Sequence, residues 1–358
     1  MPRVAGCDPG TSSLDVLVLD GGVAAGQVRF TPDDLRADPA APISWLRDRG
    51  PFDLIAAPSG YGLPLVRAAD CTDAQLELMS LVRPDDRGAG GGVAGFSAVA
   101  RAFRDSGLPA VFLPGVVHLP TVPAHRKLNT IDLGTADKLC VAALAIDRVA
   151  DSWTRADPVC VVELGSAFTA VMVVNGRGEI VDGAGGTSGP LGWRSGGAWD
   201  GEAAYLLSPL RKADLFAGGA CGVANEEVRR AAFVESLVKA VGGLCGLHAP
   251  DERFEKVVLS GRLFAAEPGF AESLHLTGAL APFARSDRDV VALPSLDGAW
   301  VKEAAQGAAL IADGLCGGRF RPVVDGLRLR EACGTVLDGL TYPRAAAVRG
   351  WFGVAETS

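Results

Sequence analysis

The sequence lacks long apolar runs, paired cysteines and blocks of positive charge, and each absence excludes a class of protein. No apolar run reaches the roughly 18–20 residues of a membrane-spanning helix, and no signal-peptide pattern follows Met1. The eight cysteines are scattered without a Cys-x-x-Cys pair, which favours small buried thiols in a reducing compartment. A net charge of −8 without a basic tract argues against a nucleic-acid partner. We therefore expect a cytoplasmic protein that binds neither membranes nor nucleic acids.

What the sequence does contain is enough apolar residues for two folded domains. Hydrophobic residues make up 48% of the 358 residues, which is typical of a folded chain. A chain of this length usually divides into about two domains. The polar stretch 151–157 is the candidate boundary. We therefore predict one domain over residues 1–150 and a second over residues 151–358.

The N-terminal segment predicts three successive strands, over residues 3–8, 14–20 and 23–30. The first strand ends in Asp8-Pro9-Gly10-Thr11-Ser12-Ser13. A carboxylate at a strand end, followed by a glycine turn and hydroxyl side chains, suits a phosphate and its Mg²⁺ ion, which prefers oxygen ligands. An ordinary β-hairpin with an Asp/Gly turn explains this segment equally simply.

The same pattern recurs in the second half of the chain. A strand over residues 159–164 carries Glu163 near its end, and Gly165, Ser166 and Thr169 follow. Strands are predicted again over residues 170–174 and 179–182. Because a whole unit repeats at domain scale, the repeat favours phosphate binding over two unrelated hairpins.

The remaining elements follow from apolar periodicity and turn residues. Helices are predicted over residues 43–49, 73–81, 94–105, 131–149, 299–315 and 326–337, and strands over residues 52–57, 110–113, 256–260 and 290–293. The sequence thus predicts an α/β fold in which two similar mixed sheets each open with three strands.

This pattern resembles the acetate/sugar kinase–Hsp70–actin superfamily over nearly the whole chain. Residues 8–15 match its first phosphate motif, residues 163–169 the second and residues 257–262 the adenosine motif. The resemblance implies two ribonuclease H-like (actin-like ATPase) domains, each with a βββαβα-type sheet, around a central nucleotide cleft. Two positions depart from the pattern: Glu163 replaces the usual Asp, and Arg262 replaces the second glycine of the adenosine motif.

Within the superfamily the chain looks most like the archaeal-type family described as predicted butyrate kinases. The stretches 57–64, 113–123 and 129–138 carry this narrower match. The resemblance implies an ATP- and Mg²⁺-dependent kinase that phosphorylates the carboxylate of a small acid, such as butyrate, to an acyl phosphate.

The resemblance also implies roles for individual residues. Asp8 and Glu163 are expected to hold Mg²⁺ through water and to act in catalysis together with Arg194. The expected ATP contacts are Gly10, Thr11, Ser12, Gly165, Ser166, Thr169, Gly261 and Arg262. The expected substrate contacts are Ser59, Tyr61, Asp137, Lys138 and Trp193.

Several alternatives remain open at this stage. The protein is either a small-molecule kinase or a nucleotide-gated ATPase or actin-like module without phosphoryl transfer, and a scaffold with degenerate phosphate turns is a third hypothesis. The glycine-rich segment 183–197, which contains Arg194, is either part of the acceptor site or a surface loop. The expected partner is a small carboxylic acid, and the chain is either a monomer or a homodimer.

Overall fold

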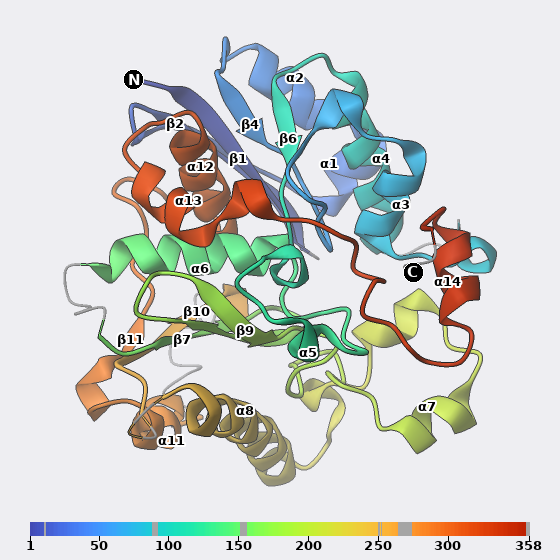
Figure 1. Cartoon of the computed structure of the whole chain (residues 1–358), viewed down its shortest axis with the longest axis vertical. Helices are drawn as coiled ribbons and strands as arrows, with labels where there is room; N and C mark the ends of the chain where they lie inside the picture. The colour runs from blue at the N-terminus through green and yellow to red at the C-terminus, as the bar shows by residue number, and fades with distance from the viewer. Residues whose placement is uncertain are drawn as a thin grey trace. The chain divides into compact units, whose positions relative to one another are not determined.

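The structure is a computed structural model, and it describes residues 1–10, 12–87, 92–150, 156–249, 251, 253–263 and 274–355 (Figure 1). The chain divides into two compact units. Unit 1 comprises Met1–Ile131, Thr135–Asp147 and Ser295–Ser358, and unit 2 comprises Asp132–Gly134 and Arg148–Pro294.

Unit 1 contains a six-stranded mixed sheet in the order β3-β2-β1-β4-β6-β5. Its strands are β1 (Arg3–Gly10), β2 (Ser13–Asp20), β3 (Val23–Phe30), β4 (Leu54–Ala56), β5 (Val66–Arg67) and β6 (Ala110–Phe112). The first three pair antiparallel, while β4 pairs parallel to both β1 and β6. Gly21 and Gly22, at φ +57° and +81°, form the tight turn between β2 and β3. The three predicted N-terminal strands are therefore confirmed.

The helices of unit 1 come from both ends of the chain. They are α1 (Pro32–Ala37), α2 (Ala41–Arg47), α3 (Asp73–Ser80), α4 (Gly92–Asp105), α5 (Ala124–Lys127), α6 (Ala136–Arg148, except its last residue), α12 (Glu303–Leu315), α13 (Arg321–Leu327) and α14 (Ala345–Trp351). The helix predicted over residues 326–337 is wrong: α13 ends at Leu327, because Arg328 adopts a left-handed conformation with φ +53°, and a short 3₁₀ turn, Leu329–Glu331, follows it.

Helix α12 packs so tightly on β1 that it fixes the domain division. A methyl group at Gly6 would lie 2.5 Å from the carbonyl carbon of Ala308 and would overlap the backbone of Ala309. Because of this packing, residues 295–358 group with the N-terminal residues. The sequence analysis had assigned them to the second domain, so the chain returns to unit 1 at a point that composition does not reveal.

Unit 2 repeats the sheet of unit 1 with five strands in the order β11-β10-β7-β8-β9. They are β7 (Val159–Leu164), β8 (Thr169–Val174), β9 (Ile180–Ala184), β10 (Lys256–Ser260) and β11 (Val290–Ala292). As in unit 1, the first three are antiparallel and the next pairs parallel to the first. The helices are α7 (Gly201–Leu207), α8 (Glu226–His248) and α11 (Leu276–Leu280). The predicted repeat is thus present as a pair of matching sheets.

Helix α8 covers one face of the unit 2 sheet. Its buried residues Phe233, Leu237, Val241 and Cys245 recur every four positions and pack on the sheet residues Cys160 and Val162. By length and composition alone α8 could cross a membrane, although only 22% of its most apolar window is buried. One face of α8 packs on the sheet, as expected for an amphipathic helix that covers a sheet.

The cysteines are all free thiols. Five of them are buried, at Cys7, Cys71, Cys140, Cys160 and Cys245. Burial raises the pKa of the Cys7, Cys140 and Cys160 thiols, so these are unreactive core groups. The expectation of small buried thiols is wrong for the other three, Cys221, Cys316 and Cys333, which are exposed.

Candidate functional site

The turn between β1 and β2 holds Asp8 against a lysine from the far end of the chain. Asp8 is 4% exposed, and its Oδ2 lies 2.5 Å from Nζ of Lys302, the residue that precedes α12. The other carboxylate oxygen, Oδ1, is buried and has no hydrogen-bond partner in the part of the chain that the structure describes. Asp8 therefore presents one neutralised oxygen and one oxygen that can still accept.

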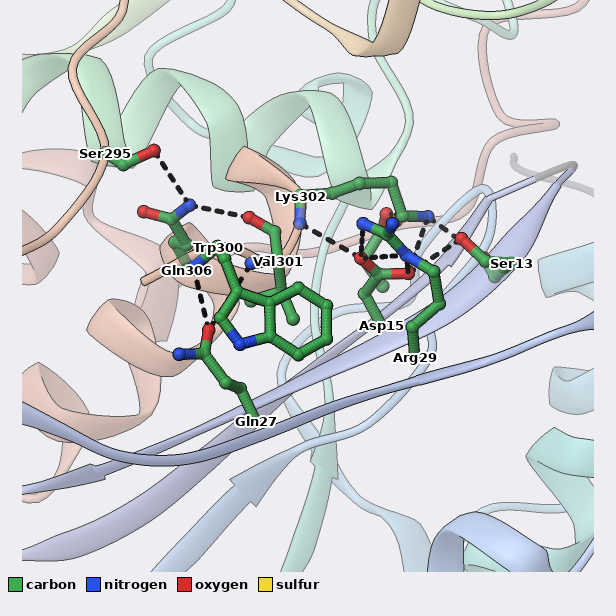
Figure 2. A network of polar contacts seen from close by, with 10 residues as sticks. Ser13, Asp15, Gln27, Arg29, Ser295, Trp300, Val301, Lys302 and Gln306 are labelled. Carbon is green, nitrogen blue, oxygen red and sulfur yellow. Dashed lines mark hydrogen bonds and ion pairs between the residues drawn. The ribbon is translucent and has the colours of Figure 1, made fainter. Parts of the chain in front are cut away.

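A second carboxylate, Asp15, anchors this arrangement (Figure 2). Arg29 donates three hydrogen bonds of 2.8–3.1 Å to Asp15, and the Ser13 hydroxyl donates another at 2.7 Å. The backbone N–H of Lys302 donates to Asp15 Oδ2 at 3.1 Å. The start of α12 is thus tied to β2 by a buried carboxylate.

The loop before α12 is held by two glutamines (Figure 2). Gln27 of β3 accepts from the Trp300 N–H at 2.8 Å, and its amide donates to the Gly298 carbonyl. Gln306 of α12 donates to the Val301 carbonyl at 2.7 Å and to the Ser295 hydroxyl at 3.2 Å. These bonds fix the approach of Lys302 to the turn.

The carboxyl groups of unit 1 titrate differently because their surroundings differ. Burial raises the pKa of Asp8, and the nearby Asp137 adds to this, while Lys302 opposes it. Burial would also raise the pKa of Asp15, but hydrogen bonds from Arg29 and the charge of Lys302 outweigh it and lower that pKa. For Asp137, burial is likewise outweighed, chiefly by Lys138, so its pKa is lowered.

The predicted substrate residues Asp137 and Lys138 lie at the start of α6. Lys138 Nζ donates to Asp137 at 2.8 Å, and the Thr135 hydroxyl donates to the same carboxylate. The N–H of Ala136 donates to the carbonyl of Gly60, which joins α6 to the turn that contains Ser59 and Tyr61. The start of α6 therefore lies next to the turn that carries Ser59 and Tyr61, two other expected substrate contacts.

Within that turn, Ser59 has a structural task. It is 3% exposed, its hydroxyl donates to the Ala57 carbonyl at 2.7 Å and accepts from the Leu113 N–H at 2.9 Å. Ser59 thus connects the ends of β4 and β6. Tyr61 is anchored by its own N–H, which donates to the Met79 carbonyl at 2.9 Å.

In unit 2, Glu163 and the buried residue Ser260 lie on neighbouring strands. Glu163 of β7 and Ser260 of β10 are register partners in parallel strands, so their side chains share one face of the sheet. Ser260 is 1% exposed, and its Oγ has no hydrogen-bond partner within the described ranges. A methyl group at Gly165 would lie 3.2–3.3 Å from both carboxylate oxygens of Glu163, so this glycine leaves room for them.

Two other predicted nucleotide contacts have different surroundings from those expected. Thr169 pairs with Leu164, which belongs to the core under α8, so its side chain lies on the opposite face from Glu163. Gly261, at φ +109°, has its Cα against the backbone of Leu164, where any side chain would collide. Its glycine is therefore explained by strand packing. Arg262 follows it at the end of β10, half-buried.

The glycine-rich segment 183–197 brings Arg194 to the second phosphate turn. Arg194 Nε donates to the Ser166 carbonyl at 2.8 Å, and one terminal nitrogen donates to the Ser166 hydroxyl at 3.1 Å. Its neighbour Trp193 instead packs edge-on against Phe233 of α8, with ring centroids 5.8 Å apart. Arg194 and Ser166 thus form a pair, whereas Trp193 packs against the hydrophobic core under α8.

The same segment is held by Asp132, which belongs to unit 2 although the stretches Met1–Ile131 and Thr135–Asp147 on either side of residues 132–134 belong to unit 1. The Asp132 carboxylate accepts from the N–H of Thr187 at 2.9 Å and from its hydroxyl at 3.0 Å. Its carbonyl accepts from the N–H of Gly185 at 3.0 Å and from the Ser188 hydroxyl. The segment is therefore a fixed element of unit 2 and not a free surface loop.

Sequence reasoning missed Lys302, Gln27 and Ser260. The signal for Lys302 is weak, because 287 positions separate it from Asp15. Ser260 directly precedes Gly261 of the adenosine motif, but the motif indicates a nucleotide contact only for the glycine and the residue after it. Of the predicted residues, Thr11 lies outside the described residues; Gly10 and Ser12 stand at the β1–β2 turn.

The acidic residues fit a hydrated Mg²⁺ ion. In the described part of the chain there is no cluster of three or more His, Cys, Asp or Glu that could hold a metal by itself. Mg²⁺ characteristically keeps several waters and takes one or two carboxylates. The buried Oδ1 of Asp8 offers an acceptor for such a bound water. The residues present therefore suit a metal carried by a ligand such as a nucleotide.

Solved structures of other proteins have a similar fold. A propionate kinase from Francisella tularensis subsp. tularensis SCHU S4 matches at 13% identity and a TM-score of 0.56, over 86% of this chain and 98% of that one. An acetate kinase from Entamoeba histolytica matches at 10% identity and a TM-score of 0.53, over 76% and 86%. A ROK hexokinase from Thermus thermophilus has 18% identity over 87% and 98%, but its TM-score of 0.42 supports no argument.

At these identities the matches show the fold alone, which is the actin-like ATPase fold, as the sequence analysis predicted. Among curated proteins no match is found. The model of one protein family, described as "Protein of unknown function (DUF1464)", matches residues 6–342. Because this match covers nearly the whole sequence, the chain belongs to the DUF1464 family.

Proposed function

We propose that the protein is an ATP- and Mg²⁺-dependent phosphotransferase that acts in the cytoplasm on the carboxylate of a small acid, such as the short-chain fatty acid butyrate. The observation that carries this proposal is the pair of acidic strand ends, Asp8 and Glu163, at matching places in two actin-like sheets. Each acidic strand end has a buried polar atom without a partner in the described chain. In unit 1 this atom is Oδ1 of Asp8, and in unit 2 it is Oγ of Ser260, the register partner of Glu163.

In this proposal each unit supplies one phosphate-binding turn. The β1–β2 turn of unit 1, with Gly10, Thr11 and Ser12, and the turn at Gly165 and Ser166 of unit 2 donate N–H and O–H groups to the phosphates. Asp8 and Glu163 accept from the water shell of Mg²⁺, which neutralises phosphate charge when bound. Arg194, whose exposed side chain donates to the Ser166 hydroxyl, would be the cation that meets the transferring phosphoryl group.

The reaction requires one new bond and one broken bond. A carboxylate oxygen of the acid attacks the γ-phosphorus, the bond from that phosphorus to the β–γ bridging oxygen breaks, and ADP leaves with the electron pair. No proton moves, because the acceptor is already ionised. The reaction therefore needs no general base. In unit 1 the carboxylates of Asp8, Asp15 and Asp137 are each paired with a cation instead. The names of the acetate and propionate kinase structures also support an acid acceptor.

The test is ATP turnover with a panel of acceptors. Purified protein is incubated with Mg·ATP and acetate, propionate, butyrate, longer acids or sugars, and acyl phosphate is trapped with hydroxylamine. We expect hydroxamate only with short-chain acids, and ADP release that depends on the acid. ADP release that no acceptor changes would instead identify a nucleotide-gated ATPase, and a sugar phosphate product would overturn the acid acceptor.

A further inference from the structure

Lys302 has more hydrogen-bonding capacity than the surrounding protein uses. Its side chain is 12% exposed, and its ammonium group contacts Asp8 Oδ2 at 2.5 Å and the Ser13 carbonyl at 3.0 Å. The next acceptor, Asp15 Oδ1, lies at 3.9 Å, beyond hydrogen-bond distance. A lysine ammonium has three N–H donors. Among the described residues, therefore, two of the three have acceptors at bonding distance.

The ammonium also lies directly against the β1–β2 turn. A side chain at Gly10 would overlap Lys302 Nζ, so the glycine leaves room for the ammonium against the turn. Arg29, the other cation of the network, is already committed to Asp15 by three hydrogen bonds. Arg29 keeps further N–H donors, but of the two cations it is the Lys302 ammonium that contacts the turn itself, at Asp8 and at the Ser13 carbonyl.

We propose that Lys302 binds a phosphate oxygen of the nucleotide with its third N–H while it holds the Asp8 carboxylate in place. The inference rests on the proposed function and deepens it, because it assigns a phosphate contact to a residue outside the phosphate and adenosine motifs. Asp8 keeps Oδ1 for a metal-bound water, since Lys302 occupies Oδ2. One lysine thereby positions the acid and contacts the polyanion.

The test is calorimetric binding of ATP, ADP and adenosine to the wild-type protein and to Lys302→Met, each measured with EDTA and with Mg²⁺. A charge-assisted hydrogen bond lost to a phosphate weakens binding about tenfold to a hundredfold. We expect this loss for ATP and ADP with or without Mg²⁺, and no change for adenosine. Lys256→Met is the matched control, because Lys256 is also 12% exposed and pairs with Asp289 at 3.3 Å.

Each other outcome contradicts the inference. An equal loss for adenosine would mean that Lys302 supports the fold of the site, and a loss that appears only with Mg²⁺ would mean that it acts through Asp8. If Lys302→Met does not fold, Lys302→Gln keeps a donor for Asp8 and Ser13 without the charge, and it must still lose ATP affinity. Wild-type protein that binds no ATP would overturn the proposed function itself, which keeps the two failures distinct.

Discussion

Asp15 is a fully buried side chain that remains charged, and it holds Ser13, Arg29 and the backbone of Lys302 near Asp8. Its pKa is lowered in the folded protein, where the hydrogen bonds from Arg29 and the charge of Lys302 outweigh burial. A lowered carboxyl pKa stabilises the fold above the unfolded value of about 3.9, and the stabilisation is lost as pH falls through the folded pKa. Asp15→Asn should therefore cost about 3 kcal/mol at pH 7, the low end for a broken buried pair.

Urea unfolding of wild type and Asp15→Asn between pH 7 and pH 3 measures this difference. The gap in unfolding free energy should narrow as the pH falls below about 4. The control is Asp20→Asn, which breaks the exposed Arg3–Asp20 pair and should cost less than about 1 kcal/mol. A gap that stays constant with pH would show that the charge of Asp15 does not stabilise the fold.

Replacing Ser260 should affect the stability of the free protein and its affinity for ATP in different ways. Its buried hydroxyl has no partner within the described ranges, so Ser260→Ala should leave the free protein as stable or up to about 1 kcal/mol more stable. If the hydroxyl serves Mg·ATP, the same variant should lose about tenfold in ATP affinity. Thermal unfolding with and without Mg·ATP measures both effects.

The matched control for Ser260 is Ser195, a hydroxyl that is equally buried but fully used. Ser195 donates to the Leu215 carbonyl at 2.7 Å and accepts from the Gly197 N–H at 3.2 Å. Ser195→Ala should therefore destabilise the free protein by about 1–2 kcal/mol. If both serine variants destabilise it equally, the Ser260 hydroxyl has a partner that stabilises the fold.

At the scale of elements, the contact between α12 and β1 allows no side chain at Gly6. A methyl group there would lie 2.5 Å from the carbonyl carbon of Ala308 and 2.7 Å from the carbonyl oxygen of Ala305. Gly6→Ala should destabilise the protein by about 3 kcal/mol, because the helix must move away from the strand. Gly243→Ala in α8 is the control: its site is open, and alanine should stabilise the helix by about 1 kcal/mol. Thermal unfolding of both variants should therefore show shifts of opposite sign.

The elements also show what sequence alone can predict. The strands that open each sheet were found because their apolar residues and turn glycines are local signals. The start of α6 was placed at residue 131, five positions before Ala136, because nothing local reveals that residues 132–134 pack in unit 2. For the same reason the motifs located Asp8 and Glu163 but not Lys302, which meets Asp8 through the fold.

At the scale of the whole molecule, the chain passes between the units more often than composition predicts. It leaves unit 1 at Ile131, returns at Thr135, leaves again after Asp147 and returns at Ser295. The polar stretch 151–157, the predicted boundary, begins four residues after the passage at Asp147, and the other passages have no compositional signal. Residues 132–134 belong to unit 2, where Asp132 accepts hydrogen bonds from the glycine-rich segment. Asp137 of unit 1 follows five residues later in the chain.

We therefore expect Asp132 to control the order of the segment that carries Arg194. Asp132→Ala removes the acceptor of two hydrogen bonds from Thr187, worth about 1–2 kcal/mol together. Hydrogen exchange in peptides covering residues 185–194 should accelerate about 5- to 30-fold. Under the proposed function, kcat should fall, because Arg194 is the cation assigned to the transferring phosphoryl group.

Asp338→Ala supplies the matched control for this prediction, because Asp338 accepts from the N–H of Thr335 at 2.8 Å and from its hydroxyl at 2.5 Å within unit 1. It removes the same kind of clamp, so it should accelerate exchange near residue 335 and leave residues 185–194 unchanged. If the two variants lower kcat equally, the effect is general destabilisation. If only Asp132→Ala does so, the hydrogen bonds that hold the Arg194 segment within unit 2 contribute to the reaction.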